Sequence, residues 1–132
     1  MSASVLTQSD DFPIRTRRPV HSGKVRSVYF LDAADSRRLI ERRGYAVNPE
    51  TSLALMLISD RLSAFDCAWR SESMGGVPGK GAALNQVAAH WCECLASRSD
   101  LAHHLLEMPH PMLWVVRQAR PVMLEAIGRR YL

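Results

Sequence analysis

The stretch LALMLISDRLSAFD, residues 53–66, decides how this chain folds. Its first six residues, Leu53 to Ile58, form a continuous apolar run of strand length that ends in the polar cluster Ser59-Asp60-Arg61. Such a run predicts a strand, and Asp60-Arg61 can be interpreted as a local ion pair that fixes the strand end. A second short strand is expected at Phe65–Trp69.

Upstream of this stretch the sequence predicts one more strand and a short helix. Val25 to Leu31 (VRSVYFL) indicates a strand that begins directly after a Ser-Gly turn. Asp35 to Arg43 is typical of a short surface helix, with Asp35 or Ser36 as its N-cap and Gly44 as its stop. Residues 1–19 are polar and contain two prolines, so we expect an irregular lead-in before a folded lobe over residues 20–132.

Downstream, a glycine-rich loop over residues 74–81 precedes the main helix, expected from about Ala82 to Ser97. Apolar residues follow helical spacing along one side of that helix. They are Leu84, Val87, Ala88, Trp91 and Leu95.

The last part of the chain predicts two more strands, Leu113 to Val116 and Val122 to Ile127, after a linker marked by Pro109 and Pro111. Pro121 suits the turn between these strands or a strand edge. The element order therefore predicts an α+β lobe built around an antiparallel sheet with one main helix.

Composition narrows the class of protein. The 132 residues are 47% hydrophobic and 23% charged, which is ordinary for a globular domain. The sequence shows neither an apolar run long enough to span a bilayer nor a secretory signal, and its three cysteines, Cys67, Cys92 and Cys94, are an odd number. We therefore expect a cytoplasmic protein with reduced thiols and no membrane association.

The net charge of +4 does not indicate nucleic-acid binding. Fifteen of the 17 basic residues are arginines, several of them in scattered pairs, without interleaved aromatic residues. The two lysines, Lys24 and Lys80, both directly follow glycine. Glycine permits close backbone approach and lysine is a compact charge, so these two positions point to phosphate.

Three common site patterns do not fit. The loop before Lys80 lacks the first glycine of a P-loop and the Ser or Thr after its lysine. His90, Cys92 and Cys94 do not share one helix face, so no metal site is expected from this chain. No nucleophilic triad follows from spacing alone.

Four ordered segments carry a resemblance to a known family. They are Gly23-Lys24-Val25-Arg26, SDRLSAFD (residues 59–66), Pro78-Gly79-Lys80-Gly81, and the final RPVMLEAIGRRYL (residues 120–132). The chain resembles the SAICAR synthetase (phosphoribosylaminoimidazole-succinocarboxamide synthase) family of purine-pathway ligases from about Val20 to Leu132. Members read similarly, with GKVR, SDR-[IL]-SAFD, a PGKG-like loop before a helix, and P-x-x-x-E-x-x-x-R-x-Y-L-T-G-S.

The sequence departs from the family pattern in a few places. Met123 stands where many relatives have proline, Arg130 where glycine is usual, and Cys92 where a second aromatic is common. The chain ends at Leu132, directly before the family's Thr-Gly-Ser segment. We therefore expect a truncated amino-terminal portion, without the second (ATP-grasp-like) lobe that supplies acidic magnesium ligands in the family.

The resemblance implies an ATP-dependent ligase that joins L-aspartate to the carboxylate of the aminoimidazole ribonucleotide CAIR, through an acyl phosphate, to give SAICAR, ADP and phosphate. ATP and Mg²⁺ are the implied cofactors, and no nucleic-acid or membrane partner is implied. The truncated chain is expected to be inactive alone. The competing interpretation is a non-catalytic nucleotide-binding remnant or a basic nucleic-acid-binding module.

The resemblance also implies roles for individual residues. Gly23, Lys24, Val25 and Arg26 would form the loop over the ATP phosphates. The imidazole nucleotide would be bound by residues from three segments, namely Ser63, Asp66, Lys80, Glu125 and Arg129. For Glu125 and Arg129, a cross-strand ion pair is the alternative.

Overall fold

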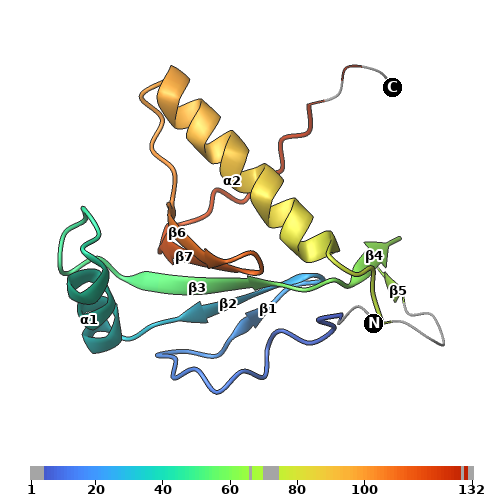
Figure 1. The fold of residues 1–132 in the computed structure, drawn as a ribbon, viewed down its shortest axis with the longest axis horizontal. Coiled ribbons are helices and arrows are strands. Elements are labelled where there is room, and N and C mark those ends of the chain that lie inside the picture. The colour runs from blue at the N-terminus through green and yellow to red at the C-terminus, as the bar shows by residue number, and fades with distance from the viewer. Residues whose placement is uncertain (1–4, 66, 70–74, 129, 131–132) are drawn as a thin grey trace.

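The fold is a five-stranded antiparallel sheet with two helices and a separate two-stranded hairpin (Figure 1). The computed structural model describes residues 5–65, 67–69, 75–128 and 130. The elements in chain order are β1 (His21–Ser22), β2 (Arg26–Phe30), α1 (Ala33–Arg43), β3 (Leu53–Ile58), β4 (Leu62–Ala64), β5 (Cys67–Trp69), α2 (Lys80–Arg98), β6 (Leu105–His110) and β7 (Leu113–Arg117). The α+β class and the antiparallel sheet are as predicted.

Strand β3 lies at the centre of the sheet, whose order is β1-β2-β3-β7-β6. Its residues alternate between two cores. Leu53 packs with Leu31, Ile40 and Val115 beneath α1, and Ala54 packs on the other face with a second cluster. That cluster contains Ala54, Ala89, Trp114 and Val116. Because both faces are covered, β3 is apolar throughout instead of alternating between apolar and polar residues.

Helix α1 begins earlier than predicted. Its N-cap is Asp32, whose side chain accepts a hydrogen bond from the Asp35 amide at 2.7 Å, so neither Asp35 nor Ser36 is the cap. Ser36 is buried, and its hydroxyl accepts from the Leu53 amide at 3.1 Å. The helix stops at Gly44, as predicted, in the left-handed conformation with φ +69°.

Helix α2 packs on the sheet through small residues. Its buried positions are Gly81, Asn85 and Ala89, and a Cβ at Gly81 would lie 2.7 Å from the Met112 side chain. This close approach involves only the first half of the helix, and the second half stands clear of the sheet (Figure 1).

The predicted apolar side of α2 therefore lies largely outside the core. Val87 is 56% exposed and Trp91 is 60% exposed, and Leu84 and Leu95 are also exposed. Helical spacing identified the apolar side correctly, but the buried side of α2 is the one with the smallest residues.

The carboxyl-terminal third differs from prediction in two places. Pro109 lies in β6 and Pro111 in the following turn, so these prolines do not mark a linker. Strand β6 is at the sheet edge and has register shifts, where a missing amide donor is tolerated. Residues 122–127 form no strand, and Val122 and Leu124 are exposed, because no described strand pairs with them.

The short strand expected at Phe65–Trp69 is formed only over Cys67–Trp69, as β5, the second arm of a hairpin. Strands β4 and β5 pair through Leu62–Trp69, Ser63–Ala68 and Ala64–Cys67. Phe65 lies in the intervening turn with φ +51° and is 92% exposed. The hairpin projects at the end of the sheet where β3 finishes (Figure 1).

Residues 5–20 contain no helix or strand but are fastened to β2. The buried Ser9 hydroxyl lies 2.8 Å from the Ser27 hydroxyl, and Tyr29 donates from its phenol to the Ser9 carbonyl at 2.9 Å. The Arg17 amide donates to the Phe30 carbonyl at 2.9 Å. None of the helices in the described residues has the length and apolarity needed to cross a membrane.

Candidate functional site

The Gly23–Arg26 segment is the tight turn that joins β1 to β2. The Gly23 amide donates to the Arg26 carbonyl at 2.7 Å, which leaves Lys24 and Val25 at the tip of the turn. A Cβ at Gly23 would lie 3.1 Å from the Arg26 carbonyl oxygen, so glycine suits this closure. Lys24 is exposed. The structure thus places the four predicted phosphate residues in one compact backbone turn.

The polar end of β3 lies directly beside this turn. The Ser59 amide and hydroxyl both donate to the Val25 carbonyl, at 2.8 and 3.0 Å. Arg61 donates from Nε to the Ser59 hydroxyl at 3.0 Å and from Nη2 to the Gly23 carbonyl at 3.3 Å. Two segments joined by hydrogen bonds between residues 34 and 38 positions apart in sequence therefore form one unit.

Asp60 has a separate, structural role. Its carboxylate accepts from the Leu6 amide at 3.1 Å and from the Gly81 amide at 2.9 Å, and the residue is 3% exposed. Gly79, the N-cap of α2, has no side chain for capping, so Asp60 supplies the missing acceptor from a neighbouring segment. The possible Asp60–Arg61 ion pair is not formed, because the two side chains bind different partners.

Lys80 is the first residue of α2 and not a loop residue as expected. Its ammonium group donates to the Arg61 carbonyl at 2.9 Å. Ser63 is half-buried in β4, two residues beyond Arg61. The structure therefore brings Lys80 and the start of the β4–β5 hairpin to the same end of the sheet as the Gly23–Arg26 turn.

The other three predicted substrate positions are Asp66, Glu125 and Arg129. Asp66 and Arg129 lie outside the described residues. Glu125 is exposed in the irregular segment after β7, so it is not on a last strand as predicted. The cross-strand ion pair between Glu125 and Arg129 stays an open prediction, although the strand it required is not formed.

The Arg26 side chain extends from β2 toward Trp114 on β7. Its guanidinium carbon lies 5.5 Å from the centre of the Trp114 ring, a cation–π arrangement. Burial lowers the pKa of Arg26, and it also lowers the pKa of the nearby His104, with further lowering by the charges of His103, Arg26 and Arg117. The Trp114 indole N–H is buried and has no hydrogen-bond partner among the described residues. This face is thus aromatic and cationic, and suits an anion better than a cation.

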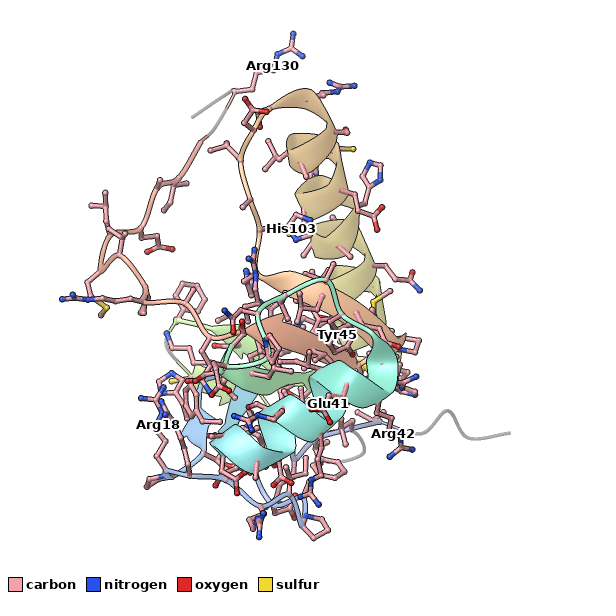
Figure 2. The ribbon with its side chains drawn as sticks, turned by 90° about the vertical axis from the view of Figure 1, so that its left-hand side faces the viewer. Arg18, Glu41, Arg42, Tyr45, His103 and Arg130 are labelled. Carbon is pink, nitrogen blue, oxygen red and sulfur yellow. The ribbon has the colours of Figure 1, made fainter. Side chains whose placement is uncertain are left out.

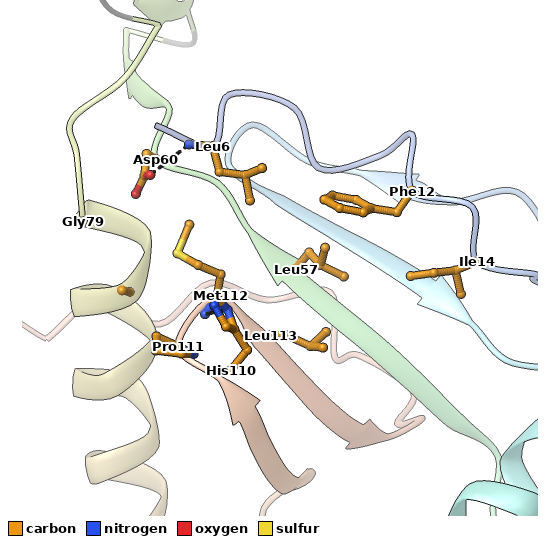
Figure 3. Close-up of a pocket in the computed structure, with 11 residues that line it drawn as sticks. Leu6, Phe12, Ile14, Leu57, Asp60, Gly79, His110, Pro111, Met112 and Leu113 are labelled. Carbon is orange, nitrogen blue, oxygen red and sulfur yellow. Dashed lines mark hydrogen bonds between the residues drawn. The ribbon is translucent and has the colours of Figure 1, made fainter. Parts of the chain in front are cut away.

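A cavity beside the carboxyl end of β3 is mainly apolar (Figure 3). It has a volume of about 700 Å³ and is lined by residues of the lead-in, β3 and the β6–β7 turn, including Leu6, Phe12, Leu57 and Met112. Asp60 reaches its edge with a carboxylate already bonded to Leu6, as the dashed line in Figure 3 shows. This lining contains no lysine or arginine that could bind a phosphate.

A smaller, polar cavity of about 500 Å³ adjoins Arg61. It is lined by Thr7, Gln8, Asp10, Arg61 and Gly75, so the lead-in and the glycine-rich loop both contribute to it. Within the described residues no group of three or more His, Cys, Asp or Glu side chains could hold a metal ion.

Sequence reasoning did not single out Ser59 and Arg61 as partners of the turn. Both stand in the quoted motif SDRLSAFD, but the site roles in that motif were assigned only to Ser63 and Asp66. The sequence signal that could have identified Ser59 and Arg61 is their position directly after the apolar strand Leu53–Ile58. Recognising their partner requires knowing that β2 pairs with β3 in the register Arg26–Ile58.

Comparisons with known proteins agree on one family. Its sequence model, described as SAICAR synthetase, matches residues 41–132. Relatives named phosphoribosylaminoimidazole-succinocarboxamide synthase from Aliivibrio fischeri (strain MJ11), Colwellia psychrerythraea and Saccharophagus degradans are 55%, 56% and 54% identical to this chain. Each alignment covers 100% of this chain but 36% of the relative, so the chain spans about a third of their length.

A solved structure titled SAICAR synthase has the same fold. It matches 80% of this chain and 36% of its own, with a TM-score of 0.52 and 19% sequence identity.

Proposed function

Because this chain belongs to the SAICAR synthetase family, we propose that it forms the ATP-phosphate-binding part of a ligase that joins L-aspartate to the carboxylate of CAIR. A carboxylate does not react with an amine at neutral pH. Transfer of the ATP γ-phosphoryl group to the CAIR carboxylate gives an acyl phosphate and ADP. The aspartate amine then attacks the acyl carbon, phosphate leaves with the carbon–oxygen bond electrons, and the product is SAICAR.

The observation that carries the proposal is the Gly23–Arg26 turn with its neighbouring cations. A tight backbone turn allows phosphate to approach main-chain amides, and Lys24, Arg61 and Lys80 place positive charge around it. Lys24 at the exposed tip is our candidate for direct contact with the ATP phosphates. Substrate contacts are proposed for Ser63 and Lys80, and by resemblance for Asp66, Glu125 and Arg129.

Magnesium is not accounted for by the described residues around this turn. The one carboxylate of the motif within the described residues, Asp60, is buried and already accepts two amide hydrogen bonds, so it does not fit a hydrated Mg²⁺ ion. We therefore assign no step through the metal to these residues. The chain alone is proposed to bind ATP weakly and to have no ligase activity, and its proposed location is the cytoplasm.

Titration calorimetry with ATP and Mg²⁺ tests the phosphate role. Lys24→Ala should weaken ATP binding about tenfold or more, because a charged hydrogen bond to phosphate is lost. The matched control is Arg42→Ala, an exposed cation on α1 at the far end of the sheet (Figure 2). Equal affinities for wild type and Lys24→Ala would contradict the role. A parallel assay for SAICAR should detect no turnover by the chain alone.

A further inference from the structure

A backbone turn that binds phosphate must keep its carbonyl oxygens away from the anion, because a carbonyl dipole directed at phosphate repels it. In the Gly23–Arg26 turn two of these carbonyls are occupied from the β3 side. The Val25 carbonyl accepts from the Ser59 amide and hydroxyl, and the Gly23 carbonyl accepts from Arg61 Nη2 at 3.3 Å. The turn is therefore held in one orientation by the residues that follow β3.

Arg61 is the residue that connects both points of attachment. Its Nε donates to the Ser59 hydroxyl at 3.0 Å, while its Nη2 reaches Gly23 on the turn. The guanidinium is planar and its donors have fixed separations, so one side chain sets the spacing between the two partners. A lysine ammonium has the charge but cannot reproduce two divergent donors from one rigid plane.

The position of Arg61 is itself fixed from a third segment. Its carbonyl accepts from the ammonium group of Lys80 at 2.9 Å, the first residue of α2. A displacement of Lys80 on α2 would therefore shift Arg61 and, through it, the Gly23–Arg26 turn. This chain of contacts joins three of the four family motifs: the GKVR turn, SDRLSAFD and the PGKG-like loop.

We infer that Arg61 is a positioning residue that orients the Gly23–Arg26 turn for phosphate and couples that turn to Lys80. The inference rests on the proposed function for its ligand. Arg61 acts through the backbone of Gly23 and through Ser59, and its own contact with nucleotide is not required.

Amide hydrogen exchange in the full chain tests this without any ligand. In Arg61→Met, exchange at the Gly23 and Ser59 amides should become about tenfold faster, the size expected from losing one charged hydrogen bond. Arg61→Lys should restore less than half of that protection on a logarithmic scale, since only one of the two donors can be replaced. Arg42→Met, on the exposed face of α1, is the control and should leave both amides unchanged.

Calorimetry with ATP and Mg²⁺ on the same variants separates this inference from the proposed function. Faster exchange together with weaker ATP binding in Arg61→Met supports both. Faster exchange with unchanged ATP affinity overturns the positioning role, because the turn would bind phosphate equally well without its support. Unchanged exchange at Gly23 and Ser59 overturns it whatever ATP does. A wild-type chain that binds no ATP overturns the proposed function. In that case faster exchange at Gly23 and Ser59 in Arg61→Met still supports the orienting of the turn by Arg61, and unchanged exchange still overturns it.

Discussion

Replacing Asp60 by asparagine tests whether one buried carboxylate holds three segments together. Its two oxygens accept from the amides of Leu6 in the lead-in and Gly81 in α2, at 3.1 and 2.9 Å, and the residue itself lies two positions beyond the end of β3. Asparagine has nearly the same shape but only one acceptor oxygen. One amide would therefore face an NH₂ group and lose its partner.

The expected loss of stability follows from these contacts. A hydrogen bond to a charged group contributes about 1.5–3 kcal/mol, and a negative charge near a helix N-terminus adds about 0.3–1 kcal/mol. Asp60→Asn keeps one bond in weaker form, loses the other and removes the charge. The free energy of unfolding should therefore fall by about 3 kcal/mol.

Urea denaturation followed by far-ultraviolet circular dichroism measures this difference. With a slope near 2 kcal/mol/M, the midpoint should shift down by about 1.5 M. Asp100→Asn is the control, because Asp100 is exposed just after α2 and its change should stay within about 0.5 kcal/mol. If the free energy of unfolding of Asp60→Asn also stays within about 0.5 kcal/mol of wild type, the reasoning is refuted. The rate of amide hydrogen exchange should also rise at both Leu6 and Gly81, and unchanged rates at both amides would likewise refute the reasoning.

Two other perturbations test the packing and the titration of this fold. A Cβ at Gly76 would lie 2.3 Å from the Asp60 carbonyl oxygen, so Gly76→Ala should cost about 2–3 kcal/mol in urea denaturation. A Cβ at Gly128 would have nothing within 4 Å, so Gly128→Ala should leave the urea midpoint unchanged. Equal midpoints for Gly76→Ala and Gly128→Ala would contradict the clash at Gly76. Burial first, and then nearby cations, lower the pKa of His104 in the folded state. The unfolded state therefore binds the proton first, and stability should fall as pH decreases below about 6.5. His104→Gln should weaken this dependence, and an identical pH profile for both proteins would exclude His104 as its source.

Local sequence signals predicted the elements whose partners are close in the chain. Strand β3 has the bounds that its apolar run indicated, and α1 ends at Gly44, where a left-handed residue is needed. The N-cap was placed too late because Asp32, Asp35 and Ser36 are all acceptable caps by residue type. Which of them caps the helix depends on Ser36 being drawn into the core beside Leu53.

Helix α2 shows where periodicity is insufficient. The apolar spacing of Leu84, Val87, Trp91 and Leu95 is real, yet these side chains are exposed. The helix meets the sheet where Gly81 allows close approach to Met112, and that contact selects a different side of the helix. In the same way, β6 was not predicted because Pro109 within it and Pro111 just after it indicate a linker unless the strand is known to lie at a sheet edge.

The sequence by itself determined the family, the α+β class and the tight turn at Gly23–Arg26, because each depends on residues that are neighbours in the chain. Only the tertiary structure decided what surrounds that turn. Ser59, Arg61 and Lys80 reach it through the pairing of β2 with β3 and the docking of α2. These contacts join residues about 20 to 40 positions apart, and no local propensity specifies them, since strand register and helix docking are set by the packing of both cores together.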